Sequence, residues 1–236
     1  KFMPVKINYK SDTLKKNLEN IVLFVDDTYS FSHLKKHISS SEYSYISDLI
    51  NIKDKKKKII TYDVSSKKKI ILVSVKKKIL SSEIENLGAK FYEEFKNSKL
   101  KFYELNTDTL SKNLKNFILY FLHGIKLKSY TFERYKTKKT HQDMFISLIG
   151  NNKPSSSDQN KFKAIEEGTF YARDLVSEPG NILHPDEYAK RLISLKKIGL
   201  KVNVLDEKKL KKLGMNTLLG VGQGSIRGSY LVTMEW

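Results

Sequence analysis

The chain of 236 residues contains no cysteine, which excludes disulfide bonds and thiol chemistry. It also lacks a long apolar run. The longest apolar stretches, such as residues 21–25 and 70–73, have the length of a β-strand, whereas a membrane-spanning helix needs about 18 apolar residues. No signal peptide is visible at the N-terminus. These absences lead us to expect a cytoplasmic protein without membrane partners.

Arginine is scarce, with four residues against 40 lysines, although the net charge is +18. Residues 51–139 hold 23 lysine and arginine residues against nine acidic ones. Recognition of phosphates and bases favours the arginine fork, so the lysine surplus has two interpretations. It is either a solvated surface produced by codon drift in an AT-rich gene or a face that binds polyanions. For the second case the candidate nucleic-acid-binding residues are Lys55, Lys56, Lys57, Lys58, Lys67, Lys68 and Lys69.

Short runs of β-branched and aromatic residues alternate with helical patterns in the first 150 residues. One predicted helix begins with a capping box at Ser82 and Glu85, and another covers about residues 110–122. The alternation predicts an α/β fold in which a mixed or parallel sheet is flanked by helices. The predicted strands are residues 5–9, 21–26, 58–64, 70–75, 100–105 and 144–149.

A stretch rich in glycine, asparagine, proline and serine at residues 150–157 has the composition of a linker. We therefore expect an N-terminal α/β domain at 1–150, a linker with a connecting helix at 151–178, and the truncated start of a second α/β domain at 179–236. The later elements are predicted to be a long helix at 158–176, a helix beginning at Pro185, a strand at 201–205, a short helix between Asp206 and Gly214, and a strand at 230–236.

No residues of the sequence assemble a nucleophile, a base and an orienting group. His33 and His37 lie one helical turn apart but lack the glutamate of a zinc-protease helix, which favours an amphipathic surface turn. Glu166 and Glu167 are adjacent and point about 100° apart on a helix, so they are interpreted as part of a solvated face. The sequence therefore predicts no catalytic, cofactor-binding or metal-binding residue within this chain.

Two further motifs have ordinary structural interpretations. Asp26 and Asp27 end a predicted strand, where aspartate commonly forms a turn or caps a helix. The glycine-rich residues 220–225 lack the lysine and serine or threonine of a phosphate-binding loop. They are expected to form a tight turn that needs a positive φ or a close backbone approach.

Four segments together resemble one known family. Residues 121–136 (FLHGIKLKSYTFERYK) precede the linker, and residues 172–185 (ARDLVSEPGNILHP) end the long helix and begin the next one. Residues 209–215 (KLKKLGM) and 221–225 (VGQGS) follow in order. This series resembles the leucyl aminopeptidase (cytosol aminopeptidase) family around the start of its catalytic domain.

The resemblance implies a metallo-aminopeptidase that removes N-terminal residues from peptides with two divalent ions, zinc, manganese or magnesium. It also implies a homo-hexamer, and weak DNA binding in some members. The family's metal ligands and catalytic residues would lie beyond Trp236, so the chain alone is expected to be inactive and to bind no catalytic metal. Three functions stay open: the N-terminal part of an aminopeptidase, a basic nucleic-acid-binding module, and a non-catalytic fragment that associates with a separate catalytic chain.

Overall fold

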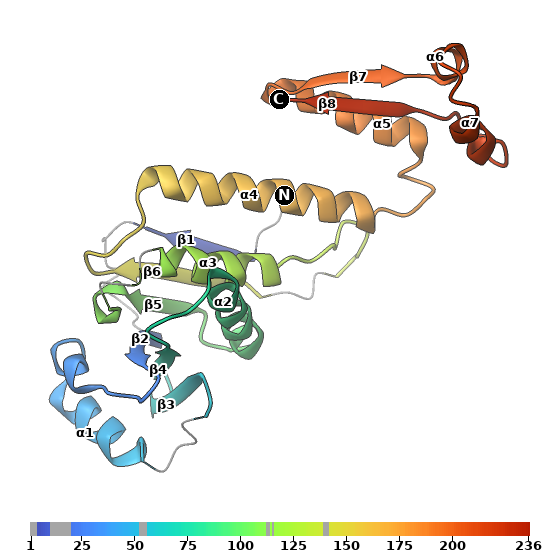
Figure 1. Ribbon diagram of the computed structural model, residues 1–236. Coiled ribbons are helices and arrows are strands. Elements are labelled where there is room, and N and C mark those ends of the chain that lie inside the picture. The colour runs from blue at the N-terminus through green and yellow to red at the C-terminus, as the bar shows by residue number, and fades with distance from the viewer. Residues whose placement is uncertain (1–3, 10–19, 52–55, 112–113, 115, 139–141) are drawn as a thin grey trace. The chain divides into compact units, whose positions relative to one another are not determined.

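A computed structural model describes residues 4–9, 20–51, 56–111, 114, 116–138 and 142–236 of the chain. Contacts between residues divide the chain into two compact units, Lys1–Phe170 and Tyr171–Trp236 (Figure 1). Each unit is described by itself. The division falls inside a long helix, and the three segments expected from the sequence, with boundaries at 150 and 178, stay a prediction.

The first unit contains a six-stranded sheet with the order β1-β6-β5-β2-β4-β3. All neighbouring strands are parallel except β3, which runs antiparallel to β4. The predicted mixed, mainly parallel sheet is therefore confirmed, and each predicted strand agrees with the structure to within two residues at either end. The strands are β1 (Val5–Asn8), β2 (Asn20–Asp26), β3 (Ile59–Ser65), β4 (Lys68–Val75), β5 (Phe102–Asn106) and β6 (Met144–Ile149).

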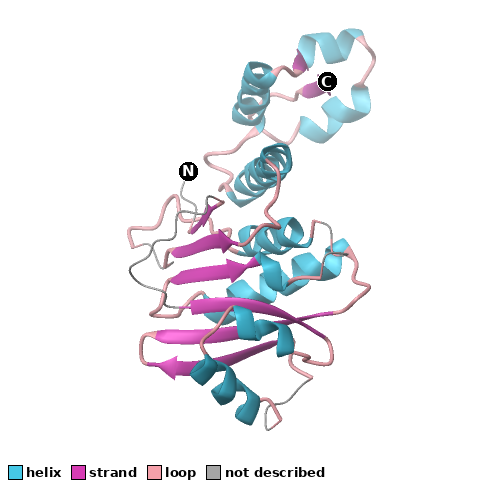
Figure 2. Cartoon of the chain, turned by 90° about the vertical axis from the view of Figure 1, so that its left-hand side faces the viewer, coloured by secondary structure: helices cyan, strands magenta, loops and turns pink. Residues whose placement is uncertain are grey.

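Helices cover both faces of this sheet, because successive side chains of a strand point to opposite faces. In β2, Val22 and Phe24 join a core formed with α2 and α3, whereas Leu23 joins a second core that includes Ile46 of α1. Figure 2 shows the strands side by side with helices packed against them. The helices of the unit are η1 (Ser32–Lys36), α1 (Ser40–Leu49), α2 (Ser81–Phe95), η2 (Thr107–Thr109), α3 (Phe117–Lys128) and α4 (Ser156–Ser177).

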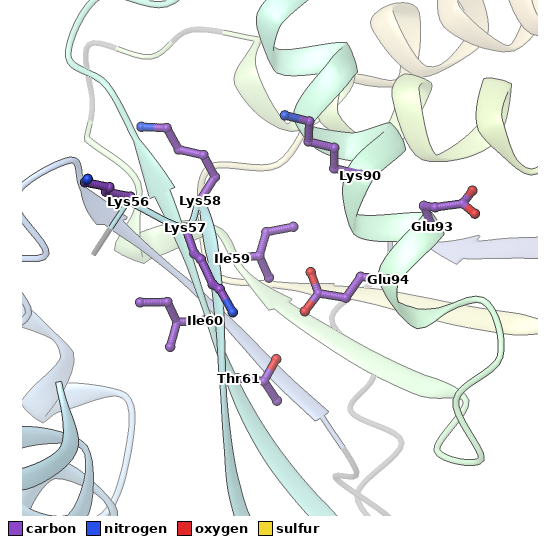
Figure 3. Close-up of a pocket in the computed structure, with 9 residues that line it drawn as sticks. All are labelled: Lys56, Lys57, Lys58, Ile59, Ile60, Thr61, Lys90, Glu93 and Glu94. Atoms are coloured by element: carbon purple, nitrogen blue, oxygen red, sulfur yellow. The ribbon is translucent and has the colours of Figure 1, made fainter. Parts of the chain in front are cut away.

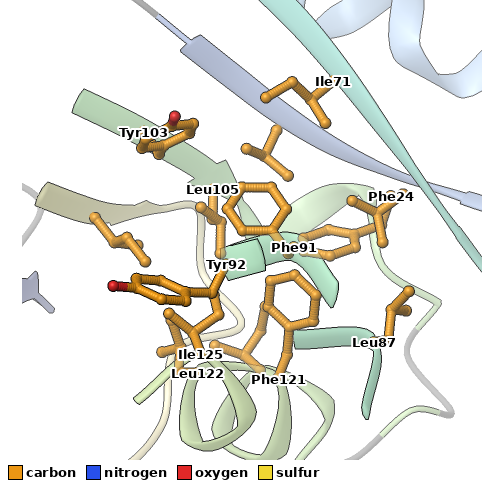
Figure 4. Packing of buried hydrophobic residues seen from close by; sticks show 14 of the residues in the cluster. Phe24, Ile71, Leu87, Phe91, Tyr92, Tyr103, Leu105, Phe121, Leu122 and Ile125 are labelled. Atoms are coloured by element: carbon orange, nitrogen blue, oxygen red, sulfur yellow. The ribbon is translucent and has the colours of Figure 1, made fainter. Parts of the chain in front are cut away.

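The larger core is rich in aromatic side chains (Figure 4). The rings of Phe91 and Phe121 meet edge to face with centroids 5.5 Å apart. Two glycines bring α2 and α3 this close together. A Cβ atom on Gly88 would lie 2.0 Å from the carbonyl oxygen of Phe121, and one on Gly124 would lie 1.9 Å from the carbonyl oxygen of Glu85.

Two helix predictions in this unit need correction, and one helix was missed. The predicted capping box at Ser82 and Glu85 is wrong, because α2 begins at Ser81 and the Glu83 carboxylate accepts the Leu80 N–H at 3.0 Å. The second predicted helix is shifted, since α3 begins at Phe117; within 110–122, residues 112, 113 and 115 lie outside the described part of the chain. Helix α1 was not predicted, although Ser39 and Glu42 form a true capping box there.

The second unit combines helices with a two-stranded antiparallel sheet, β7 paired with β8. The elements predicted around Pro185, at 201–205, after Asp206 and at 230–236 are confirmed. The unit contains α5 (Pro185–Ile193), η3 (Ser194–Ile198), β7 (Lys201–Leu205), α6 (Glu207–Lys212), α7 (Asn216–Gly222) and β8 (Leu231–Glu235).

The glycine-rich segment differs from the predicted tight turn. Gly220 and Gly222 belong to helix α7, and neither has a positive φ. The expected close approach does occur at Gly222, where a Cβ atom would lie 2.0 Å from the hydroxyl of Ser229. A larger residue at 222 would therefore require the Ser229 side chain to move, whereas the local backbone conformation does not require glycine.

Candidate functional site

The two histidines of η1 do not converge on one point. The Nε2 atom of His33 lies 3.2 Å from the carbonyl oxygen of Phe24, and the Nδ1 atom of His37 lies 2.9 Å from the side-chain nitrogen of Asn106. Between them Leu34 is buried. This arrangement is the amphipathic turn that the sequence favoured.

Asp26 forms a turn, as expected for an aspartate at a strand end. Its Oδ1 atom accepts hydrogen bonds from the Thr28 N–H at 3.1 Å, the Thr28 hydroxyl at 2.7 Å and the Ser30 N–H at 2.9 Å. Burial raises the pKa of Asp26, but these hydrogen bonds outweigh burial and hold the pKa below its usual value. The carboxylate is therefore occupied in shaping the chain after β2.

Glu166 is buried, so the predicted solvated face is wrong for this residue, whereas Glu167 is exposed. Glu166 follows Phe162 by four residues and precedes Phe170 by four, and this spacing places all three on one side of α4. The same spacing was available in the sequence as a signal of burial. Burial raises the pKa of Glu166, and the positive charge of Lys126 on α3 opposes the shift.

His123 on α3 is buried beside Glu166 and contacts two other helices. Its Nδ1 atom lies 2.9 Å from the Glu85 carboxylate of α2, and its ring meets Phe162 of α4 edge to face at 5.2 Å. Glu85 is 38 residues away in the chain, so no local spacing indicates this pair. The polar groups of α2, α3 and α4 thus compensate one another inside a helix interface, which attaches α4 to the first unit.

A second polar network lies in the family-like residues of the second unit. Glu178 directly follows the last residue of α4 and is buried, and its carboxylate lies 3.0 Å from the Arg191 guanidinium of α5. Arg191 also contacts Glu187 at 3.0 Å, and its carbonyl oxygen accepts the Tyr171 hydroxyl at 3.1 Å. Arg191 therefore joins the end of α4 to α5.

Asp186, in the first turn of α5, holds the segment before β8. Its Oδ1 atom accepts the Tyr230 hydroxyl at 2.7 Å, and its Oδ2 atom lies 3.6 Å from Arg227 and 3.2 Å from His184. The hydrogen bond from Tyr230 lowers the pKa of the Asp186 carboxyl, and the carboxylate raises the pKa of the Tyr230 hydroxyl in return. The two networks fix the start of α5 and the start of β8 relative to each other.

These networks do not form a metal centre. Among the residues that the structure describes, no group of three or more histidine, aspartate and glutamate side chains could hold a metal ion. The described residues therefore do not fit the two divalent ions that the resemblance implies. His141 lies outside the described residues.

The candidate nucleic-acid-binding lysines separate into two groups. Lys55 lies outside the described residues, and residues 56–58 are exposed just before β3. Lys67 lies in the turn between β3 and β4 and is exposed. In contrast, Lys68 and Lys69 belong to β4 and are half-buried, where Lys68 contacts Glu42 at 2.5 Å and Lys69 contacts Asp63 at 2.6 Å. The interpretation as a solvated lysine surface therefore does not hold for Lys68 and Lys69.

Comparison with known proteins bears on the whole chain. The catalytic-domain model of the cytosol aminopeptidase family matches residues 170–236. A probable cytosol aminopeptidase of Brucella suis biovar 1 (strain 1330) is 44% identical over 120 residues, which cover 48% of this chain and 24% of that protein. A probable cytosol aminopeptidase of Bradyrhizobium sp. (strain BTAi1) is 42% identical over 118 residues, with 48% and 24% coverage.

Solved structures agree with the fold. A mutant of tomato leucine aminopeptidase superposes with a TM-score of 0.76 at 17% identity, covering 99% of this chain and 50% of that one. The bottromycin maturation enzyme BotP in complex with Mn gives a TM-score of 0.68 at 15% identity, covering 92% and 44%. The chain thus corresponds to half or less of the length of these relatives.

The family-model match and the curated relatives support the leucyl aminopeptidase (cytosol aminopeptidase) family, and the solved structures agree with its fold. The resemblance found in the sequence is confirmed. Within the described part of the chain, no helix has both the length and the apolar character required to cross a bilayer.

Proposed function

We propose that this chain is the N-terminal portion of a two-metal leucyl aminopeptidase that removes N-terminal residues from peptides. The observation that carries the proposal is the match of residues 170–236 to the catalytic-domain model of the family. The aligned part of the Brucella relative is 24% of that protein, which leaves most of its length for further functional residues. We place the metal ligands and catalytic residues of this protein beyond Trp236.

The described residues contribute structure to such an enzyme. Arg191 and Asp186 fix the start of α5 against the end of α4 and the start of β8. Two divalent ions, zinc, manganese or magnesium, would supply water activation and polarisation of the scissile carbonyl in the complete protein. The Mn complex of BotP supports a divalent ion of this kind. We further propose a cytoplasmic homo-hexamer with peptide substrates.

The proposal is tested by comparing two proteins made from the natural gene: residues 1–236 alone, and the full reading frame including any sequence after Trp236. Both are dialysed, supplied with Mn²⁺ or Zn²⁺, and assayed for hydrolysis of a leucyl amide. We expect hydrolysis only from the longer protein. Stoichiometric metal and leucyl-amide hydrolysis in residues 1–236 alone would contradict the assignment of catalysis beyond Trp236.

The same purified protein distinguishes the single-chain enzyme from a fragment that associates with a separate catalytic chain. If the natural reading frame stops at Trp236 and the purified protein carries a second polypeptide with the metal, the non-catalytic fragment is the correct function. An intact mass larger than that of residues 1–236 supports the proposed single-chain enzyme.

A further inference from the structure

Strand β3 is the last strand of the six-stranded sheet, and its outer edge has no strand beside it among the described residues. The hydrogen bond from the Ser74 N–H to the Lys58 carbonyl, at 2.8 Å, fixes which residues of β3 face β4. Backbone groups alternate between the two sides of an antiparallel strand. With the observed register, residues 60 and 62 therefore bond to β4, whereas Ile59 and Thr61 direct their N–H and C=O groups outward.

Asp63, the next residue whose backbone groups point away from β4, follows the same alternation. The carbonyl oxygen of Asp63 accepts a hydrogen bond from the Tyr45 hydroxyl of α1 at 3.2 Å, so it points away from β4. The outward groups of Ile59 and Thr61 have no such side-chain partner within the described ranges. The hydroxyl of Thr61 is also buried there without a hydrogen-bond partner. This edge offers main-chain donors and acceptors that a further strand can use.

A basic groove of about 780 Å³ lies along this edge, between β3 and α2. Figure 3 shows its lining, which comprises Lys56, Lys57, Lys58, Ile59, Ile60, Thr61, Lys90, Glu93 and Glu94. The negative charges are compensated locally. Glu93 contacts Lys96 at 2.5 Å and Lys128 at 3.4 Å, and Glu94 interacts electrostatically with Lys57. Lys58 acts electrostatically on Glu83, which lies outside the lining of the groove, and Lys90 forms no ion pair among the residues that the structure describes.

We propose that the edge of β3 binds an extended acidic segment of a partner protein, which adds to the sheet as a seventh strand. The outward main-chain groups of Ile59 and Thr61 form hydrogen bonds with the added strand, and the ammonium groups of Lys58 and Lys90 select acidic side chains. A second copy of this chain is disfavoured because pairing two such edges brings lysines against lysines.

A peptide fits this edge better than a nucleic acid for two reasons. A phosphate backbone offers no N–H donors to the outward carbonyl groups, so it leaves half of the ladder unused. The groove also contains only lysines as cationic groups, which give point charges without the bidentate geometry that favours phosphate.

The proposal is tested on the full chain with fluorescently labelled, capped octapeptides in an anisotropy titration at low salt. One peptide alternates valine with glutamate, and its control alternates valine with lysine. Two further acidic peptides carry N-methyl groups, one on the odd-numbered amides and one on the even-numbered amides. We expect binding of the acidic peptide only, and a loss of about tenfold for one methylated peptide but not the other, because only alternate amides face β3.

Protein variants locate the site. Lys58→Gln with Lys90→Gln is expected to weaken binding about three- to tenfold, because two charge contacts are lost. Lys196→Gln with Lys197→Gln is the matched control, since both lysines are exposed in η3 of the second unit. Thr61→Pro removes one outward N–H and no hydrogen bond to β4, so it should weaken binding of the acidic peptide and leave the fold intact.

Three results would overturn the proposal. The first is no binding of the acidic peptide. The second is equal affinity of the two methylated peptides for the wild-type chain. This measurement needs no protein variant, so it remains informative if Thr61→Pro fails to fold. The third is displacement of the peptide by a single-stranded oligonucleotide at equal affinity together with insensitivity to methylation, which would identify a general polyanion surface.

Discussion

Replacing Gly88 by alanine tests how closely α2 and α3 are packed. The new Cβ atom would meet backbone atoms of Phe121, with the carbonyl oxygen at 2.0 Å and the carbonyl carbon at 2.9 Å. Backbone atoms cannot move aside by changing rotamer. Restoring an ordinary contact of 3.4 Å requires the helices to separate by about 1.4 Å, which also loosens the contact of Phe91 with Phe121.

The expected magnitude follows from two opposing effects. Overpacking of this kind lowers the free energy of unfolding by about 3 kcal/mol, the upper part of the usual range, because only backbone can yield. Alanine is favoured over glycine inside a helix by about 1 kcal/mol. The net loss is about 2 kcal/mol, which corresponds to a fall of about 4–8 °C in Tm for a unit of this size. Gly124→Ala should behave alike, since its Cβ atom would lie 1.9 Å from the Glu85 carbonyl oxygen.

Gly168→Ala is the matched control, because Gly168 also lies within a helix but has no atom within 4 Å of a built Cβ. This variant should stabilise the protein by about 0.5–1 kcal/mol. The only tryptophan, Trp236, belongs to the second unit, so unfolding of the first unit is followed by hydrogen exchange of peptides from α2 and α3. Equal stabilisation by Gly88→Ala and Gly168→Ala would refute the close packing of the two helices.

Other perturbations address charge. Glu166→Gln should gain stability relative to wild type as pH rises. Burial raises the pKa of Glu166, so the wild-type protein loses the stability contributed by the neutral carboxyl as that group ionises. If this is wrong, urea titrations at several pH values will show the same pH dependence of unfolding free energy for both proteins. Arg191→Ala should destabilise the second unit by about 3 kcal/mol, because the buried Glu178 carboxylate loses its ion pair with Arg191, and unchanged hydrogen exchange in α5 would exclude this. Nucleic-acid binding, if present, should be weak, independent of sequence and strongly salt-dependent, since Arg134 is the only arginine in residues 51–139. Charge reversal at residues 55–58 and 67–69 should then weaken binding to random and to defined duplexes equally. A sequence preference that survives higher salt would contradict a non-specific lysine face.

The strands could be predicted from the sequence because burial leaves a clear pattern. Strands β2 and β4 are buried on both faces and contain the unbroken apolar runs 21–25 and 70–73, as central strands of a sheet do. The helix ends were less predictable. Serine followed three residues later by glutamate occurs at Ser39 and at Ser82, but only the first is a capping box. At the second, Glu85 binds His123, a partner that is distant in the sequence.

The polar networks could not be predicted for a related reason. The pair formed by Arg191 and Glu178, and the contact of Tyr230 with Asp186, depend on how separate segments pack, and no short spacing encodes them. Helix α7 was missed because Gly220 and Gly222 disfavour a helix locally. The close approach of the Ser229 side chain to Gly222 depends on how the following segment packs, and no short spacing encodes it.

The strand order has a consequence for the time course of folding. Among the described residues, strand β1 pairs with β6 alone, and Val5 meets Met144, so β1 waits for a strand that lies far later in the chain. Strand β2 likewise needs β4 and β5, whose residues 69–75 and 103–105 emerge much later from the ribosome. Pairings so distant along the chain slow folding. The largely apolar segment Asn20–Asp26 therefore stays without its neighbours during synthesis, and its apolar side chains are prone to aggregation until β4 and β5 have emerged.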